Sequence, residues 1–351
     1  MLLKLIISII FILLGLWSLC AWIRLDPPAN ILLTLPKILY TSFISTILLI
    51  YLVLLLAYSF VFLYLSFNAL PIDSFYFFSY LLLWLYTLAG FTYCDFIRHA
   101  SVNNNSLNPL HEKVIDSKHL HKKLAFQTYD FSSYKSAKQF ILYTPSEGAH
   151  KETCLVYLNY EECSVHPNVK GALYLRDLAL KEGYSFCIYG GNGKEETYLP
   201  GIVNDIQKAL AFLKNKTSSS RFILCGKSSS AQLALLSAFS NTQPETEIFS
   251  SFPLQVDGII ALYPIVDLSK HYIDFNCKDI PILLIHGSHD SQVPIEPTRK
   301  FYEIMSSRHK TIDYLELPFM EHAFDSLNVN HSVVGHKMKR EITNWLYTYF
   351  R

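Results

Sequence analysis

The stretch Phe222-Ile-Leu-Cys-Gly-Lys-Ser-Ser-Ser-Ala-Gln-Leu-Ala-Leu-Leu236 decides the fold of this chain. Its first four residues are apolar and typical of a strand, and residues 231–239 have the small and apolar composition of a packed helix. Between them, Gly226-Lys-Ser-Ser-Ser230 leaves room only for a sharp turn. A strand, a sharp turn with a central Ser and a helix form the context of a nucleophile elbow, with Ser228 as the nucleophile.

Two other functions of this turn compete with the elbow. A Ser-rich turn before a helix also serves as a simple N-cap. The Gly-Lys-Ser triplet also occurs in phosphate-binding loops, but that motif needs a Gly five residues before Gly226, and Arg221 stands there. The choice between elbow and cap therefore depends on whether the rest of the chain supplies partners for Ser228.

Composition restricts the function classes. The 351 residues carry a formal net charge of +1, so nothing indicates a nucleic-acid partner. The seven cysteines are scattered without a C-x-x-C pair, which predicts buried thiols and gives neither a disulfide framework nor a metal site. No motif implies a cofactor.

Residues 1–95 are almost free of charge and contain three apolar runs, at 2–23, 39–67 and 75–93. Such runs are long enough to cross the ~30 Å hydrocarbon layer of a membrane. We expect an integral, multi-pass membrane protein with about three transmembrane helices rather than three buried core helices. The first run also resembles a signal peptide, but it lacks a small-x-small cleavage site, so we expect an uncleaved anchor.

Basic residues suggest the orientation of these spans. With three spans, the first loop and the large domain share one side, and that side holds Arg24, Lys37, Arg98 and Lys113. Basic residues concentrate on the cytoplasmic side of membrane proteins. We therefore expect the large domain on the cytoplasmic side, with residues 24–37 as a loop.

Strands and helices alternate over residues 124–351, after a polar linker at 96–123. The predicted strands are 139–143, 154–158, 185–189, 222–225, 256–262, 280–285 and 311–317, and the predicted helices are 168–182, 200–214, 231–239, 294–306 and 332–349. This alternation predicts an α/β domain with a mostly parallel sheet and helices on both faces. Reactive groups in such sheets gather at the carboxyl ends of the strands.

Two residues downstream have the properties that a nucleophilic Ser requires. A Ser hydroxyl needs a base to take its proton, and that base needs an acid to orient it. Asp290 directly follows the strand at 280–285, and His322 directly follows the strand at 311–317. The order Ser228, Asp290, His322 is that of a hydrolase triad. His289 is a weaker candidate base because it would share a loop with the acid.

Residues ~125–350 resemble the α/β-hydrolase superfamily, in its esterase/lipase branch of hormone-sensitive-lipase-like and microbial acyl esterases. The segment His286-Gly-Ser-His-Asp-Ser-Gln-Val-Pro294 matches the acid-loop pattern H-G-x-x-D-x-x-V-P in full, and His322-Ala-Phe-Asp325 resembles the base segment. The resemblance implies that Ser228, Asp290 and His322 form a triad that cleaves a small-molecule or lipid ester, without a cofactor or metal.

The resemblance also implies an oxyanion hole, made by the backbone N–H groups of Ser229 and Tyr160. The branch usually carries H-G-G-G after its first core strand, and here Asn159-Tyr-Glu161 stands in that place. Losing Gly restricts the backbone, and a carboxylate near a developing oxyanion is unfavourable. We therefore expect either a rebuilt loop or a weak enzyme.

Other functions stay open at this point. The altered glycines are consistent with an inactive hydrolase fold that serves as a membrane scaffold, and the same triad serves serine peptidases. A transporter is disfavoured because no charge lies inside the three apolar runs apart from Lys4. Residues 267–278 are a candidate for a small lid, and no oligomeric state follows from the sequence.

Overall fold

The computed structural model describes residues 2–20, 22–23, 31–68, 74–100, 102–103, 126–133, 136–145, 151–160, 169, 171–190, 199–239, 256–267 and 278–351. The chain divides into two compact units. The first comprises Met1–Ala100 together with two short segments, Gly287–Gln292 and Leu317–Met338. The second comprises Ser101–His286, Val293–Glu316 and Lys339–Arg351. Residues 104–123 of the predicted linker at 96–123 and residues 268–277 of the candidate lid lie outside the described residues. Residues 96–99 of the predicted linker are instead the last turn of a helix.

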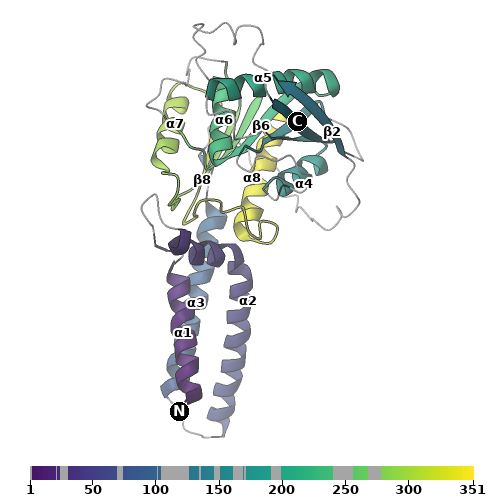
Figure 1. Ribbon diagram of the computed structural model, residues 1–351. Coiled ribbons are helices and arrows are strands. Elements are labelled where there is room, and N and C mark those ends of the chain that lie inside the picture. Colours follow the sequence, from purple (N-terminus) through teal and green to yellow (C-terminus); the bar gives the residue numbers. More distant parts are fainter. Residues whose placement is uncertain are drawn as a thin grey trace. The chain divides into compact units, whose positions relative to one another are not determined.

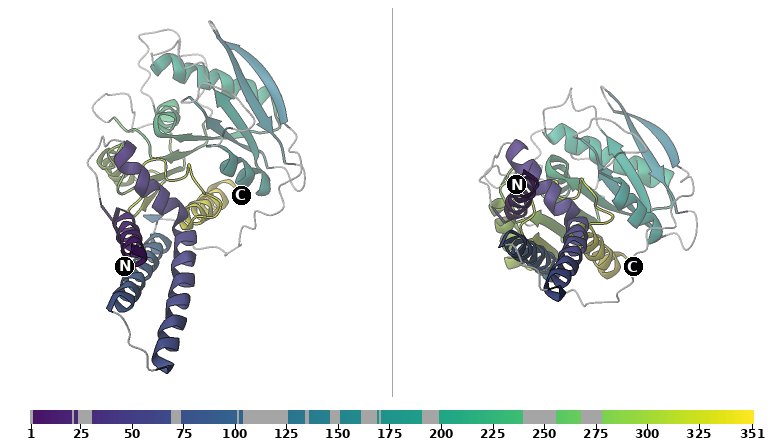
Figure 2. Two further views of the ribbon diagram at one scale, coloured as in Figure 1. Left: turned by 60° about the horizontal axis from the view of Figure 1, so that its bottom comes forward. Right: turned by 90° about the horizontal axis from the view of Figure 1, so that it is seen from below.

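The first unit contains three apolar helices, α1 (Leu2–Cys20), α2 (Ile31–Phe67) and α3 (Ser74–His99). All three contact one another and run side by side (Figures 1 and 2). Within the described residues, Thr34–Leu65 of α2 and all of α3 are long and apolar enough to cross a membrane, while α1 contributes the shorter apolar stretch Ile9–Leu19. The three predicted apolar helices are therefore present, and two of them reach spanning length by this measure.

Helix α2 begins earlier than the sequence suggests. The expectation of a loop through residue 37 was wrong for residues 31–37, which are helical and include Pro36. The Lys37 side chain is only 2% exposed, and its ammonium lies 2.9 Å from the Glu321 carboxylate. A lysine next to a proline predicts a loop, because neither residue favours the interior of an apolar helix. Here the charge is paired, which makes its burial tolerable.

The second unit is built on a sheet of nine strands among the described residues, in the order β1-β9-β8-β7-β6-β4-β5-β3-β2. The strands are β1 (Val102–Asn103), β2 (Phe126–Ser133), β3 (Ser136–Tyr143), β4 (Thr153–Leu158), β5 (Ser185–Gly190), β6 (Arg221–Lys227), β7 (Gly258–Leu262), β8 (Ile282–Gly287) and β9 (Ile312–Leu317). The run β5-β4-β6-β7-β8 is parallel. Strands β2, β3 and β5 pair antiparallel, as do β1 and β9. The predicted α/β architecture is confirmed: the centre of the sheet is parallel, as expected, and antiparallel strands are added at its edges.

Strands β1 and β2 were missed by the sequence analysis. Strand β1 has only two residues and lies in the predicted linker, while β2 contains several polar residues and no strict apolar alternation. Both owe their extended conformation to a neighbour, since β1 pairs with β9 and β2 pairs with β3 along its full length. Pairing of this kind overrides weak local propensity.

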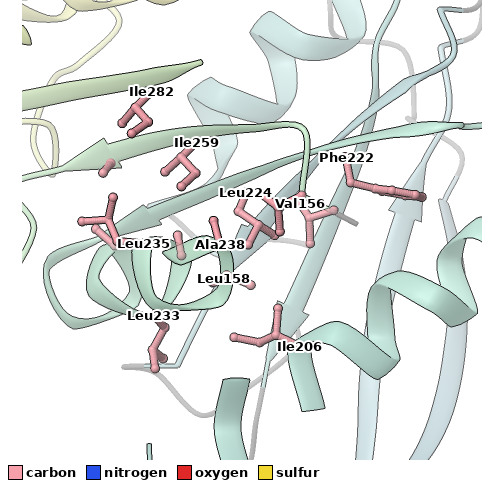
Figure 3. Packing of buried hydrophobic residues seen from close by; sticks show 14 of the residues in the cluster. Val156, Leu158, Ile206, Phe222, Leu224, Leu233, Leu235, Ala238, Ile259 and Ile282 are labelled. Atoms are coloured by element: carbon pink, nitrogen blue, oxygen red, sulfur yellow. The ribbon is translucent and has the colours of Figure 1, made fainter. Parts of the chain in front are cut away.

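Helices cover both faces of the sheet. They are α4 (Leu173–Lys181), α5 (Leu199–Lys216), α6 (Ser228–Phe239), α7 (Glu296–Ser307) and α8 (Val333–Phe350). Figure 3 shows Leu235 and Ala238 of α6 packed against Leu224 of β6 and Ile259 of β7, in a cluster to which α5 and α7 also contribute. On α8, Trp345 and Phe350 close over Gly258 of β7, where an added Cβ would lie 2.5 Å from the Phe350 ring.

Strand β9 carries a buried carboxyl group, that of Asp313. Asp313 is 0% exposed, and neither of its carboxylate oxygens has a hydrogen-bond partner among the described residues. Burial raises the pKa of Asp313 to about 6, an effect that the polar groups of Tyr349 and Trp345 on α8 offset only in part. The folded protein therefore holds a proton on Asp313 that the unfolded chain releases near pH 4.

We expect Asp313→Asn to stabilise the protein at pH 8. Because the folded pKa lies above the unfolded one, the stability of the wild type falls as the pH rises from about 4 through 6 and stays low above that range. The shift corresponds to roughly 3 kcal/mol, and the neutral amide should recover about 1–3 kcal/mol of it. Thermal unfolding at pH 4.5 and pH 8 measures the difference, which should nearly vanish at the lower pH. A variant less stable than the wild type at pH 8 would show that the carboxylate has a favourable partner.

Candidate active site

The backbone of Ser228 is unusual for a residue with a side chain. Ser228 joins the end of β6 to the start of α6 and has φ 50°, in the left-handed region. A non-glycine residue there is strained, and such strain concentrates at functional sites. An N-cap residue takes extended backbone angles instead. The geometry at Ser228 therefore favours an elbow over a cap.

The residue two before Ser228 has to be Gly. A Cβ on Gly226 would lie 2.4 Å from the carbonyl oxygen of Ser230 and 2.6 Å from the nitrogen of Ala231. Both are backbone atoms of the first turn of α6, so they cannot move aside as a flexible side chain can. The close passage of β6 under α6 is what allows the turn at Ser228 to be sharp.

Helix α6 begins at this turn and provides an electropositive end. Ser228 and Ser229 are its first two residues, and the first four N–H groups of a helix have no partner within the helix. These groups and the helix dipole stabilise negative charge. A negatively charged oxygen that forms beside Ser228 would therefore lie in a favourable field.

The chain after β4 meets the same turn. Strands β4 and β6 are neighbours, although β5 lies between them in the sequence, so the direction of strand addition reverses here. Ligands of parallel sheets bind at such a switch point. The Tyr160 N–H, just after β4, donates a hydrogen bond to Ser230 Oγ at 3.2 Å.

This contact involves a residue whose role the sequence analysis missed. Ser230 stands at the last position of the elbow, where the pattern G-x-S-x-G has Gly, and its hydroxyl holds the amide expected to face an oxyanion. The signal was available: a hydroxyl replaces Gly in the elbow of a chain that also lacks the glycines after β4. Glu161, the third residue of the altered loop, lies outside the described residues.

The two other predicted triad members meet within the first unit. His322 Nδ1 lies 2.8 Å from Asp290 Oδ2. The Asp290 side chain is fully buried, while the His322 side chain is 19% exposed. Asp290 Oδ1 accepts a hydrogen bond from the Gln292 N–H at 2.9 Å, which fixes the carboxylate. With Nδ1 facing the acid, Nε2 of His322 is the nitrogen left to exchange a proton with a reactant.

The loops that carry the acid and the base interlock. The His289 N–H donates to the Met320 carbonyl at 3.0 Å, and the Phe319 N–H donates to Ser288 Oγ at 2.8 Å. A Cβ on Gly287 would lie 2.4 Å from the Met320 carbonyl oxygen, so the loops pass at backbone contact. These contacts hold the two loops together and explain why Asp290 and His322, 32 positions apart in the chain, can keep their hydrogen bond.

His289 has a different environment from the predicted base. Its ring packs edge-on against Phe319, with centroids 5.3 Å apart, and its Nδ1 lies 3.1 Å from Lys37 Nζ. The ring nitrogen that faces an ammonium accepts a hydrogen bond, so it is not placed to remove a proton from a substrate. The structure thus favours His322 as the base.

The predicted buried thiols are confirmed where the structure describes them. Cys94, Cys154, Cys187 and Cys225 are free and buried. Burial raises the pKa of Cys154 to about 12, so this thiol stays protonated and unreactive. Among the described residues, no three His, Cys, Asp or Glu side chains gather as metal ligands.

Ser228, Ser229, Ser230 and Tyr160 lie in the second unit, whereas Asp290 and His322 lie in the first. The structure therefore brings together the nucleophile with its candidate oxyanion amides, and the acid with the base. The approach of the Ser228 hydroxyl to His322 is a prediction.

Comparison with protein families gives a match to part of the chain. The BD-FAE family model matches residues 172–278. This region contains α4, α5 and the elbow at Ser228, and it ends before Asp290 and His322. A search of curated proteins found no match.

Solved structures match over a longer range. Esterase 2 of Thermogutta terrifontis, phosphoramylated by tabun, gives a TM-score of 0.54 at 14% identity, covering 63% of this chain and 94% of that one. Its propionate-bound form gives 0.53 at 13% identity, covering 63% and 93%. A structure from Lactobacillus plantarum WCFS1, described as a candidate carboxylesterase, gives 0.50 at 14% identity, covering 64% and 97%. The chain shares the fold of these proteins over nearly their whole length.

Proposed function

Because this chain has the α/β-hydrolase fold, we propose that it is a membrane-anchored serine hydrolase that cleaves carboxylic esters. The observation that carries the proposal is the pairing of two features of that fold. Ser228 has the strained backbone of a nucleophile elbow, and His322 holds a 2.8 Å bond to the buried Asp290. The BD-FAE match over the elbow region supports the same activity.

The topology of the sheet supports convergence of the three side chains. Ser228 follows β6, Asp290 follows β8 by three residues, and β6, β7 and β8 are adjacent and parallel. His322 follows β9, the next neighbour of β8. Carboxyl ends of neighbouring parallel strands share one edge of a sheet, which is where α/β enzymes place their reactive groups. Convergence at this edge is what the proposal requires.

Each side chain then has a defined step. The Ser228 hydroxyl attacks the acyl carbon while Nε2 of His322 removes its proton, and the alcohol leaves with that proton as an acyl-enzyme forms. Water then attacks the acyl-enzyme, gives a proton to His322 and releases the acid, and the proton returns to Ser228. Asp290 holds the imidazole in the correct orientation and stabilises its charged form.

The oxyanion hole uses backbone donors from two segments. The Ser229 N–H stands at the start of α6, where the helix dipole adds to its effect. The Tyr160 N–H is the second donor, and its 3.2 Å bond to Ser230 Oγ is long enough for a charged oxygen to compete for it. An incompletely preorganised donor predicts modest turnover, because one missing donor typically lowers it ~10²–10³-fold.

The substrate is a small-molecule or lipid-borne ester. The Thermogutta esterase was solved with bound propionate, so esters of short acids are sensible first substrates here. The length and apolar composition of α2 and α3 support the proposal of a membrane-anchored domain. We propose that the domain faces the cytoplasm, because the sequence places Arg24, Lys37, Arg98 and Lys113 in the first loop and around the start of the domain. An ester partitioned into the bilayer would then reach the enzyme by diffusion in two dimensions.

A fluorophosphonate probe tests the proposal directly, because it reacts only with an activated Ser. The full-length protein should be labelled in detergent or vesicles, and Ser228→Ala should abolish labelling. Ser237→Ala, on the same helix but with its hydroxyl bonded to the Leu233 carbonyl, should keep it. A panel of esters and matched amides then separates an esterase from a peptidase.

The alternative of an inactive scaffold is favoured by one observation, the engagement of the Tyr160 amide by Ser230. A folded wild-type protein that neither reacts with the probe nor hydrolyses any ester would support the scaffold and remove the enzyme.

A further inference from the structure

Helix α2 carries a buried charge that the proposed chemistry does not use. The Lys37 ammonium donates to the Ile23 carbonyl at 2.6 Å and to Glu321 Oε1 at 2.9 Å, and it lies 3.1 Å from His289 Nδ1. The side chains of Lys37 and Glu321 are 2% and 1% exposed. A buried pair of this kind is expensive to desolvate and is weak evidence for stability alone. Its position suggests another reason for its presence.

Glu321 is the residue immediately before His322, and it also holds the residue immediately after Asp290. Its Oε2 accepts hydrogen bonds from the Ser291 N–H at 3.0 Å and the Ser291 hydroxyl at 2.6 Å. Ser291 is 0% exposed. One carboxylate therefore ties the acid loop to the base loop, one residue away from each functional side chain, and Lys37 neutralises that carboxylate.

A second contact links the base loop to the same helices. The Phe319 ring lies among Trp22, Tyr93 and Phe96, with ring centroids 4.8, 5.5 and 5.6 Å away. Phe319 itself has φ 63°, an unfavourable conformation that this packing holds in place. The loop that carries His322 is thus fixed to the apolar helices by an ion pair and by an aromatic cluster.

We propose that Lys37 is a positioning residue for the Asp290–His322 pair, so that the apolar helix α2 is a structural part of the active site. Lys37 acts through Glu321: its ammonium holds one oxygen of the carboxylate, so that the other stays between the two loops and binds Ser291. The inference rests on the proposed function, because it concerns the acid and base of the same site.

Loss of this contact should affect turnover more than binding. Without Lys37, Glu321 becomes a buried, unneutralised anion and moves toward water, which releases Ser291 and separates the two loops. A displacement of about 1 Å at a reacting group lowers the rate by up to about 10²-fold. The acyl group of the substrate does not contact Glu321 in the proposed mechanism, so KM has no reason to change.

The test compares four forms of the full-length protein: wild type, Lys37→Met, the double variant Lys37→Met with Glu321→Gln, and Arg299→Met. Methionine keeps most of the apolar length of lysine without its charge. In the double variant, no charge is left unpaired, and the amide oxygen of Gln still accepts from Ser291. Arg299→Met is the control, because it breaks an ion pair of similar length, 2.6 Å to Glu316, that belongs to the second unit and involves neither Asp290 nor His322.

We expect Lys37→Met to lower kcat on a p-nitrophenyl ester by about 10–10²-fold with KM within about twofold of wild type. The fluorophosphonate probe, titrated to completion, should still label every folded molecule but more slowly. The double variant should recover most of the lost kcat, and Arg299→Met should retain wild-type kcat.

Two results would overturn the inference. One is an unchanged kcat in Lys37→Met, whatever its thermal stability, which would make the pair purely structural. The other is a loss of kcat that the double variant does not recover. Failure of the proposed function looks different, since the wild type itself would then show no turnover and no labelling.

Discussion

Ser228→Ala, His322→Ala and the variant that combines them should each lower kcat for ester hydrolysis by about 10⁶-fold, with no further loss in the combination. The reason is that a nucleophile without its base is as inactive as no nucleophile, so members of a triad behave as a unit. The measurement is a double-mutant cycle on kcat with the purified full-length protein. The cycle tests the predicted contact between the Ser228 hydroxyl and His322, because the two losses fail to multiply only if the two residues act together.

Asp290→Asn should lower kcat less than the other substitutions in this series. An amide keeps the shape of the side chain but favours the wrong tautomer of His322, and the expected loss is about 10⁴-fold. Multiplicative losses in the Ser228 and His322 double variant would instead mean that the two residues act separately, and the triad would be abandoned. Lys214→Ala, a substitution of an exposed residue in the last turn of α5, provides a control that should retain activity.

The second large effect concerns the turn itself. We expect Gly226→Ala to destabilise the second unit by about 3 kcal/mol, which corresponds to a fall in melting temperature of roughly 6–12 °C. The added methyl group would lie 2.4 Å from the Ser230 carbonyl oxygen, so the start of α6 must move away from β6. That movement displaces Ser228 and Ser229 together, and probe labelling should slow by at least about 10²-fold.

A matched substitution separates this steric effect from the general consequences of losing a glycine. Gly201 lies inside helix α5, where alanine is the better helix former, so Gly201→Ala should leave the melting temperature unchanged or raise it. Thermal unfolding and labelling rates measure both variants. If Gly226→Ala were as stable and as reactive as the wild type, the tight passage under α6 would not be what fixes the elbow.

Local sequence was sufficient for most elements of the second unit. Residues 154–158, 185–189 and 280–285 are apolar runs of strand length, and they correspond to β4, β5 and β8 within one or two residues. The predicted helix at 200–214 corresponds to α5, and its apolar residues at helical spacing all face the core: Ile202, Ile206, Leu210 and Leu213. These elements bury one face or both, and residues on a buried face are apolar. Apolar residues therefore recur in the sequence with the period of the helix or strand.

The contacts around the candidate site produce no periodic pattern in the sequence. The position of Asp290 and His322 after successive strands suggested that they meet, and the 2.8 Å bond between them agrees with that. Nothing in the spacing of Lys37, Ser291 and Glu321 indicated a common cluster, because they lie in three segments and owe their partners to packing. The hydroxyl of Ser230 likewise gained its role from a strand that is distant in the sequence.

The sequence by itself determined the class of the fold, the apolar helices and the residues able to do chemistry, because periodicity and short motifs are properties of neighbouring residues. Only the tertiary structure decided that Ser228 has a left-handed backbone, that the Tyr160 amide is held by a hydroxyl, and that Lys37 is helical and buried against Glu321. Each of these depends on long-range contacts, whose free energy outweighs the local preference of a serine, an amide or a lysine.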